Sequence, residues 1–253
     1  MFIHLAQRPE LSFGLQTKYI NRKRIYIGPD GNSYPSITTV LSELSKTSIQ
    51  KWRERVGEAE ANKISGQASR RGTRVHSVCE RYIKNQEEPF RGEYPNIIEL
   101  LKSIEPMLQR VNNVHGVELG LYSKHFGLAG RTDLIAEFDG TLSVIDYKTS
   151  NRTKKKEWCE SYFAQGSFYA IAYEELTGIP VSQVVIIIAV ENDQPQLFVE
   201  KRNNWVDIIW KAKKMYELNN NVKEFVVYMV TQLEHFYQLS LKTLQIHVHI
   251  FHT

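Results

Sequence analysis

The sequence predicts an α/β fold in which a mixed central sheet is flanked by helices. Residues 127–150 form two alternating apolar and polar runs joined at Asp139-Gly140, a tight-turn pair that is typical of a β-hairpin. An amphipathic helix is predicted over residues 157–176, and residues 181–190 are almost continuously apolar, as in a central strand covered on both faces. A strand, a helix and a strand in this order predict a parallel, right-handed crossover.

The remaining elements are predicted from turn residues and periodicity. A hairpin is expected over residues 17–36, with its turn at Pro29-Asp30-Gly31. Helices are then expected over 37–44, 47–66, 68–85 and 96–112, the last kinked or interrupted by Pro106, followed by a strand over 117–124. Gly72 suggests a helix start or a close backbone approach. A strand over 196–202 and a helix over 204–220 complete the pattern.

Two helices are amphipathic enough for their core residues to be predicted. The helix over 68–85 has a stripe formed by Val75, Val78, Cys79, Tyr82 and Ile83. The helix over 157–176 has a stripe formed by Trp158, Tyr162, Gln165, Tyr169, Ala172 and Leu176. We expect a single domain, with an N-terminal hairpin and helices over about 1–66, a core over about 67–221 and a C-terminal extension over 222–253.

Composition indicates an ordinary globular chain. Of its 253 residues 42% are hydrophobic and 24% charged, and the net charge of +4 permits a polyanionic partner without requiring one. Two cysteines argue against a disulfide framework. No apolar run reaches the ~20 residues of a membrane span, and the N-terminus lacks the pattern of a signal or transit peptide, so we expect a cytoplasmic protein without membrane partners.

His247, His249 and His252 form a cluster of a kind that can bind metal, but an edge strand explains it as well, and it is assigned no function.

The predicted hairpin carries two carboxylates and a lysine. Asp146 and Lys148 share one face of its second strand, and Asp133 lies on the first strand, close enough for the carboxylates to converge. Such a pair suits a hard divalent cation such as Mg²⁺, and Lys148 would orient or help deprotonate an attacking water, or balance transition-state charge. These residue types therefore indicate metal-assisted phosphodiester hydrolysis. The alternative is a surface ion pair worth about 1 kcal/mol or less.

The order of the other polar residues adds a family resemblance. Gly72, His76 and Glu80 form GxxxHxxxE; Glu118 begins a strand; GRTD ends at Asp133; DYK covers 146–148; and Gln165 and Tyr169 form QxxxY. These motifs in this order resemble the RecB-like branch of the PD-(D/E)XK nuclease superfamily. More closely, residues 22–215 are similar to the mitochondrial genome maintenance exonucleases and their phage relatives.

The resemblance implies a restriction-endonuclease-like core and a role for each matched residue. Asp133, Asp146 and the Tyr147 backbone carbonyl would bind Mg²⁺ or Mn²⁺, His76 would be a further metal ligand, and Lys148 would be catalytic. Gln165 and Tyr169 would pack against the site and hold Lys148 or the DNA, and Glu80 and Glu118 match acidic positions near the metal. Relatives with an iron–sulfur cluster carry four cysteines that this chain lacks, so no cluster is expected.

Each of these residues also has a plainer interpretation. His76 fits a satisfied core histidine, and Glu80 fits a surface pair with Arg74 or Arg81. Gln165 fits a buried amide, and Glu118 fits an exposed strand position. These interpretations do not explain why all the residues fall in one order.

The expected substrate is DNA. Basic residues flank the matched positions and would contact phosphates, although a solvated surface explains most of them singly: Arg70, Arg71, Arg74, Arg152, Lys154, Lys155 and Lys156. The resemblance implies an exonuclease for single-stranded DNA in replication, repair or recombination, with proteins of those processes as candidate partners, in the host cytoplasm if the chain is phage-encoded. The alternatives are a structure-specific endonuclease and a non-catalytic DNA-binding recombination module.

Overall fold

A computed structural model describes residues 1–5, 14–20 and 23–222, in which Met1–Ala212 form one compact unit and Lys213–Thr253 belong to a second. The described residues of the first unit contain eight strands, and their bounds are β1 Gln16–Ile20, β2 Lys23–Ile27, β3 Ser33–Pro35, β4 Val111–Ser123, β5 Leu128–Phe138, β6 Thr141–Ser150, β7 Gln183–Val190 and β8 Gln196–Lys201. Its helices are α1 Ile37–Leu41, η2 Ser42–Leu44, α2 Lys46–Val56, α3 Glu58–Ile83, α4 Pro95–Leu108, η3 Lys156–Cys159, α5 Glu160–Thr177 and η4 Arg202–Trp205, and residues 206–212 are also helical. In the part of the chain that the structure describes, no helix has the length and apolar character needed to cross a membrane.

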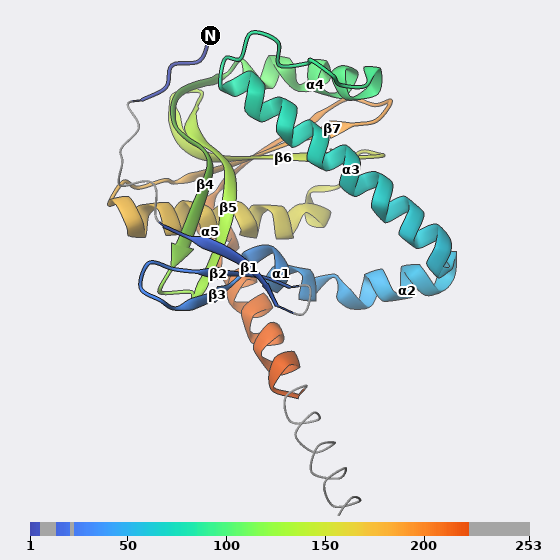
Figure 1. Cartoon of the computed structure of the whole chain (residues 1–253), viewed down its shortest axis with the longest axis vertical. Helices are drawn as coiled ribbons and strands as arrows, with labels where there is room; N and C mark the ends of the chain where they lie inside the picture. Colours follow the sequence, from blue (N-terminus) through green and yellow to red (C-terminus); the bar gives the residue numbers. More distant parts are fainter. Residues whose placement is uncertain (6–13, 21–22, 223–253) are drawn as a thin grey trace, which may run out of the picture. The chain divides into compact units, whose positions relative to one another are not determined.

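The central sheet has five strands in the order β4-β5-β6-β7-β8 (Figure 1). β6 and β7 are parallel, and the other neighbours are antiparallel, so the sheet is mixed, as predicted. The predicted hairpin joins β5 to β6 at Asp139-Gly140, where φ is 50° and 76°. Both residues adopt the left-handed region that a type I′ turn requires. α5 connects the two parallel strands, which confirms the predicted crossover connection.

Strand β7 confirms the predicted central strand. Val185, Ile187 and Ala189 belong to the core on the side of α3 and α4, whereas Val184, Ile186 and Ile188 belong to the core that includes Phe163 of α5. Alternate residues of one strand therefore enter two different cores, because successive side chains point to opposite faces. The predicted stripe of α3 is confirmed as well, since Val75, Val78, Cys79 and Ile83 are fully buried and Tyr82 is partly buried against the same core.

The predicted N-terminal hairpin is part of a three-stranded antiparallel sheet in the order β1-β2-β3. The turn between β2 and β3 lies at the predicted position and is closed by the Gly31 N–H, which donates to the Gly28 carbonyl at 3.0 Å. A bridge between Ser36 and Ala129 joins the end of this segment to β5. Tyr26 and Tyr34 pack there with Tyr122 of β4, so the small sheet covers the ends of two central strands.

The predicted division between helices 47–66 and 68–85 is wrong. The chain instead breaks at Gly57, whose φ of 84° favours glycine, and α3 then continues without interruption for 26 residues. Gly66 and Gly72 lie inside α3, so Gly72 is not a helix start, and a Cβ added to Gly72 would lie at an ordinary distance of 3.9 Å from Thr149 Oγ1. The boundary was predicted near these glycines because of their low helix propensity. The burial of the apolar stripe of α3 outweighs that propensity, so the helix continues through them.

The structure also moves the boundary between α4 and β4. The helix was expected to reach residue 112, but it ends at Leu108 soon after Pro106, and β4 begins at Val111, six residues before the predicted strand. The early part of β4 is polar and irregular, with a register shift between Asn112 and Gly116. Asn113 has a φ of 42° there, so the residues lack the regular alternation by which a strand is recognised.

Helix α5 is more deeply buried than its predicted stripe. It contacts β4, β6 and β7 of the central sheet and also α1 and η4, so it is covered on more than one side. Phe163, Phe168 and Tyr173 are buried although they lie outside the predicted stripe, whereas Trp158, which was placed in it, is 53% exposed. The prediction missed the buried residues because it assumed that one face of the helix is solvated, and it was wrong for Trp158 because this residue lies in η3, before α5 begins.

Two glycines in helices are expected to respond oppositely to alanine. A Cβ added to Gly166 would lie 2.3 Å from Val184 Cγ1 of β7, so Gly166→Ala should lower the free energy of unfolding by about 1–3 kcal/mol through overpacking. At Gly66 the same Cβ meets only the flexible end of Arg70 at 3.3 Å, so Gly66→Ala should raise the free energy of unfolding by about 0.5–1 kcal/mol. Urea unfolding of both variants measures the difference, and equal effects would contradict the packing argument.

Of the second unit, the structure describes residues 213–222, which are helical. Lys213 and Glu217 form an ion pair one turn apart at 2.5 Å. The predicted extension from 223 onward, with His247, His249 and His252, lies outside the described residues.

Candidate active site

The two predicted carboxylates lie where β5 and β6 separate. The ladder between these strands ends at the pair Leu134 and Ile145, and Asp133 and Asp146 are the next residue on each strand. Beyond this point the Tyr147 N–H donates to Asp133 Oδ2 at 2.9 Å instead of continuing the ladder. The hairpin thus places both aspartates at one end of its paired region, as the sequence predicted.

Helix α3 brings His76 to Asp133. His76 Nδ1 lies 3.2 Å from Asp133 Oδ1, so the two oxygens of Asp133 contact a histidine from one element and a backbone N–H from another. The His76 ring also lies edge-on to the Tyr147 ring, with centroids 6.1 Å apart. These contacts position the Asp133 carboxylate from two directions.

Asp146 and Lys148 form a buried ion pair on β6. The carboxylate is 1% exposed and the lysine side chain 17% exposed, and Lys148 Nζ contacts Asp146 Oδ2. Gln165 of α5 joins both residues, since its Nε2 donates to Asp146 Oδ1 at 3.1 Å and its Oε1 accepts from Lys148 Nζ at 3.5 Å. The predicted role of Gln165 in holding Lys148 is consistent with this geometry.

Tyr169 lies one turn after Gln165 and is 1% exposed. Its hydroxyl closely approaches β5 at Gly130, where an added Cβ would lie 2.7 Å from it and 2.9 Å from Ile37 Cγ2. The glycine of the GRTD segment therefore leaves room for Tyr169 to pack behind the strand that carries Asp133. Tyr169 therefore packs behind β5, and its hydroxyl also interacts with the side chain of Gln165.

Mutual charge determines how these groups titrate. Burial raises the pKa of Asp146 to about 6, and Asp133 adds to this while Lys148 opposes it. Burial also raises the pKa of Asp133, but His76, Lys148 and the Tyr147 N–H outweigh burial and hold that pKa below its ordinary value. Although burial lowers the pKa of Lys148, the two aspartates raise it overall, so Lys148 is an ammonium ion at neutral pH. The site thus favours a charge-balancing Lys148 over a proton acceptor.

The donor set fits a divalent cation that keeps several waters. Asp146 Oδ2 is buried and, among the described residues, has no hydrogen-bond partner of good geometry, only the charge of Lys148. Within the same residues no three His, Cys, Asp or Glu side chains are arranged to hold a metal by themselves. Mg²⁺ commonly takes one or two carboxylates together with waters and phosphate oxygens, which matches a pair of aspartates.

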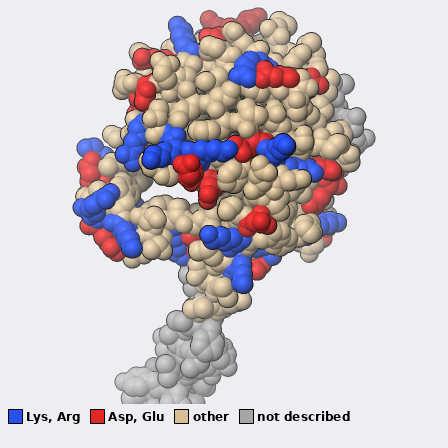
Figure 2. Space-filling model, turned by 180° about the vertical axis from the view of Figure 1, so that it is seen from behind, with Lys and Arg blue, Asp and Glu red and all other residues tan. Residues whose placement is uncertain are grey.

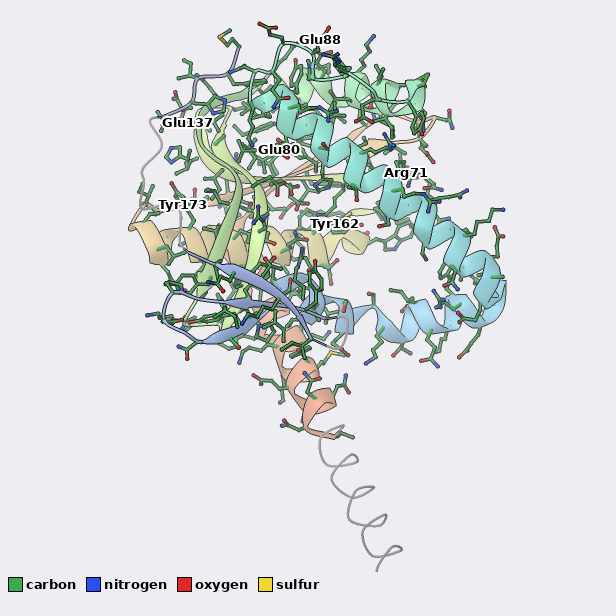
Figure 3. The ribbon with its side chains drawn as sticks, in the orientation of Figure 1. Arg71, Glu80, Glu88, Glu137, Tyr162 and Tyr173 are labelled. Atoms are coloured by element: carbon green, nitrogen blue, oxygen red, sulfur yellow. The ribbon has the colours of Figure 1, made fainter. Side chains whose placement is uncertain are left out.

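Glu118 is also brought to this site. Val117 pairs with Leu134 and Leu119 pairs with Thr132, so Glu118 between them lies opposite Asp133. The backbone of Glu118 has a φ of 55°. Burial raises its pKa to about 7, and the charges of Asp133 and Glu80 add to that effect. Glu80 lies on α3 (Figure 3), one turn after His76, and forms an ion pair with Lys84 at 2.6 Å instead of the expected pair with Arg74 or Arg81.

Glu118→Gln is expected to stabilise the metal-free protein at alkaline pH. The folded protein binds the Glu118 proton more tightly than the unfolded chain, so stability is lost as pH rises from the ordinary glutamate pKa to about 7. Glutamine does not titrate and removes this loss. As pH rises from 4 to 8, the free energy of unfolding of the variant should therefore increase by about 1–3 kcal/mol relative to that of wild type. Urea unfolding in EDTA measures it, and Glu88→Gln, at a glutamate that is 69% exposed, should show no such gain.

The predicted DNA-binding residues fall into two groups. Arg71 is 10% exposed and binds Glu191 at 2.7 Å and Asn151 at 2.5 Å, and Arg74 binds Glu93 at 3.0 Å, so both have structural partners. Lys156 forms an ion pair with Glu200. The remaining four form none of the ion pairs found among the described residues: Arg70, which is exposed on α3, and Arg152, Lys154 and Lys155, which lie over aromatic rings.

Sequence reasoning did not assign Tyr162 to the site. Its ring centroid lies 5.2 Å from Lys148 Nζ and 5.9 Å from Lys154 Nζ. The sequence held a signal for this contact, because Tyr162 and Gln165 are three residues apart and therefore neighbours on one helix surface.

The chain is similar to several known proteins. A model of the PD-(D/E)XK nuclease superfamily matches residues 51–245. Mitochondrial genome maintenance exonuclease 1 from Mus musculus is 28% identical over 131 residues, and that from Homo sapiens is 27% identical over 133 residues, each match covering 49% of this chain. These matches span only 39% and 38% of the two relatives. A crystal structure from Eubacterium rectale, solved as a candidate exonuclease, aligns with a TM-score of 0.42 at 16% identity, over 63% of this chain and 70% of that one.

The matched region contains every residue of the site described above, from His76 of α3 to Tyr169 of α5, and it covers well over half of the chain. The chain belongs to the PD-(D/E)XK nuclease superfamily.

Proposed function

We propose that this chain is a deoxyribonuclease that uses Mg²⁺ or Mn²⁺ to degrade single-stranded DNA from its ends, in replication, repair or recombination. The observation that carries the proposal is the convergence of Asp133, Asp146 and Lys148 at the end of one hairpin. Gln165 and His76 hold these groups from two helices. The similarity to mitochondrial genome maintenance exonucleases supports the choice of an exonuclease.

The residues of the chain have separate tasks in this proposal. Asp133, Asp146 and the Tyr147 carbonyl would hold the cation, with His76 as a further ligand. The cation would stabilise charge on phosphate oxygens and make a bound water more acidic. Lys148, as an ammonium ion, places positive charge beside the phosphate that is attacked and orients the water. Gln165 fixes the direction of the Lys148 side chain, and Tyr169 keeps the strand behind Asp133 in place.

An opening through the first unit supports action at DNA ends. Figure 2 shows this opening on the side of α2 and α3, with Lys and Arg side chains gathered along one edge and Asp and Glu side chains at its rim. A linear strand that passes through such an opening must enter by a free end, which a closed circle does not have. Basic side chains at the edge would bind phosphates without regard to base sequence.

The test compares end-labelled linear and circular single-stranded DNA with Mg²⁺ or Mn²⁺, using wild type and Lys148→Ala. We expect wild type to degrade the linear strand and leave the circle intact. Cleavage of the circle would instead favour a structure-specific endonuclease. If wild type retards both substrates in a gel and cleaves neither with either metal, the chain is a DNA-binding module and the proposed reaction is wrong.

A further inference from the structure

The strongest unassigned feature is an exposed tryptophan next to the candidate site. Trp158 lies in η3, at the start of the helical segment that carries Gln165, and its side chain is 53% exposed. A single exposed aromatic residue is ordinary on a protein surface, so exposure alone assigns nothing. The charges around this ring and its position relative to Lys148 carry the argument.

Two cations lie beside the Trp158 ring. The Arg152 guanidinium and Lys155 Nζ are each 5.8 Å from the ring centroid, within the range of a cation–π contact. Both cations come from the connection between β6 and α5, and neither forms one of the ion pairs found among the described residues. An exposed ring with two available cations offers one surface for a base and two charges for phosphates.

The segment that carries these groups is held in place. The Ser150 hydroxyl donates to the Arg152 carbonyl at 2.6 Å, and the Lys154 N–H and carbonyl both bind the Gln196 side chain, at 2.7 Å and 2.9 Å. The Trp158 N–H donates to the Lys155 carbonyl at 3.0 Å. Trp158 and its two cations are therefore presented by a backbone that is fixed to β6 and β8, and little ordering is needed for them to bind a strand.

The aromatic surface continues from Trp158 to the site. Tyr162 follows Trp158 by four residues, across the junction of η3 and α5, and its ring lies beside both Lys154 and Lys148, while Lys155 lies beside Trp158. In Figure 3, Tyr162 on α5 and Arg71 on α3 lie at the edge of the space between these helices. Cations and rings thus alternate from Lys148 outward, which is the arrangement that proteins use for single strands, where bases stack on rings and phosphates meet cations.

We infer that Trp158 is a positioning residue that stacks on a base of the single-stranded DNA beside the Lys148 site, while Arg152 and Lys155 bind the adjacent phosphates. This inference rests on the proposed deoxyribonuclease function and adds to it a residue that binds the strand. Stacking is tolerant of sequence because every base has a flat face, so binding by stacking suits an enzyme that degrades any sequence.

The experiment measures binding without cleavage, in the full chain with Lys148→Ala and in EDTA. Fluorescence anisotropy gives the Kd for a labelled oligothymidine of about 20 nucleotides, longer than the ~4–16 nucleotides that one binding fold covers, and for an abasic strand with the same number of phosphates. Adding Trp158→Ala should raise the Kd for oligothymidine about tenfold and the Kd for the abasic strand less than about twofold. Trp158→Phe, which keeps a flat ring, should restore the Kd to within about threefold of the parent.

Trp210→Ala is the matched control. Trp210 is 39% exposed and packs on Phe126, which contacts Phe168 of α5, ten residues beyond Trp158 and so about 15 Å away along the helix. Adding Trp210→Ala should leave the Kd for oligothymidine within about twofold of that of the parent. If Trp158→Ala binds both strands like the parent, or weakens both equally, stacking by Trp158 is refuted while the deoxyribonuclease proposal stands. If the parent binds neither strand, the inference about Trp158 is refuted, and the cleavage assay on linear and circular strands with metal tests the deoxyribonuclease proposal separately.

Discussion

Lys148→Ala is expected to lower the rate of single-stranded DNA cleavage by about 10²–10⁴ while the variant still binds the strand. The ammonium group lies beside Asp146 and is held by Gln165, so no other described cation replaces it at the same place. Its pKa is raised above the ordinary lysine value, and the lost group is therefore a full positive charge at neutral pH. Release of labelled nucleotides from a 5′- or 3′-labelled strand measures the rate, and gel retardation measures binding.

Removal of Lys148 also leaves Asp146 buried beside Asp133 without its cation. The pKa of Asp146, already about 6, should rise further in Lys148→Ala. The free energy of unfolding of this variant should therefore continue to fall as pH rises above 6, where the titration of Asp146 no longer lowers that of wild type. Lys102→Ala, which removes a charge from the exposed surface of α4, is the control for net charge and should retain full activity. Cleavage by Lys148→Ala within tenfold of wild type would exclude a direct role for this lysine.

The hairpin and the parallel pair could be predicted because their signals are local. Asp139-Gly140 requires positive φ at two successive residues, which few other pairs adopt, and the β7 sequence has no polar face to solvate. With the register set by that turn, Asp133 and Asp146 had to lie on neighbouring strands at the same level. His76 and Gln165, which contact the two carboxylates from other elements, were predicted from the family resemblance. No local pattern relates α3 to β5 or α5 to β6 at these positions.

Other features could not be predicted because they depend on tertiary contacts. Arg71 was expected to bind DNA, and its choice of Glu191 and Asn151 depends on how α3 crosses the ends of β6 and β7. Glu118 acquires its raised pKa only because β4 is irregular and places it opposite Asp133. Trp158 is exposed in η3, before α5 begins, whereas the residues of α5 are covered on several sides.

Asp133→Asn is expected to abolish the metal response of the protein together with its nuclease activity. Wild type should show a higher Tm in Mn²⁺ or Mg²⁺ than in EDTA, because a ligand that binds only the folded state stabilises it in proportion to the logarithm of its concentration over Kd. Asparagine keeps the size of the side chain but presents one oxygen and no charge, and either His76 or the Tyr147 N–H then faces an amide group. Differential scanning fluorimetry over a metal titration measures the response without any DNA.

Asp139→Asn is the matched control for this variant, since it makes the same substitution in the turn of the same hairpin. Asp139 is 54% exposed and paired with Arg110, so its loss should leave both the metal-induced rise in Tm and the cleavage rate unchanged. If Asp133→Asn kept the full rise in Tm, Asp133 would not be a metal ligand, whatever its effect on activity. If wild type showed no rise while still cleaving DNA, the cation would be bound only together with the strand, through phosphate oxygens that complete its coordination.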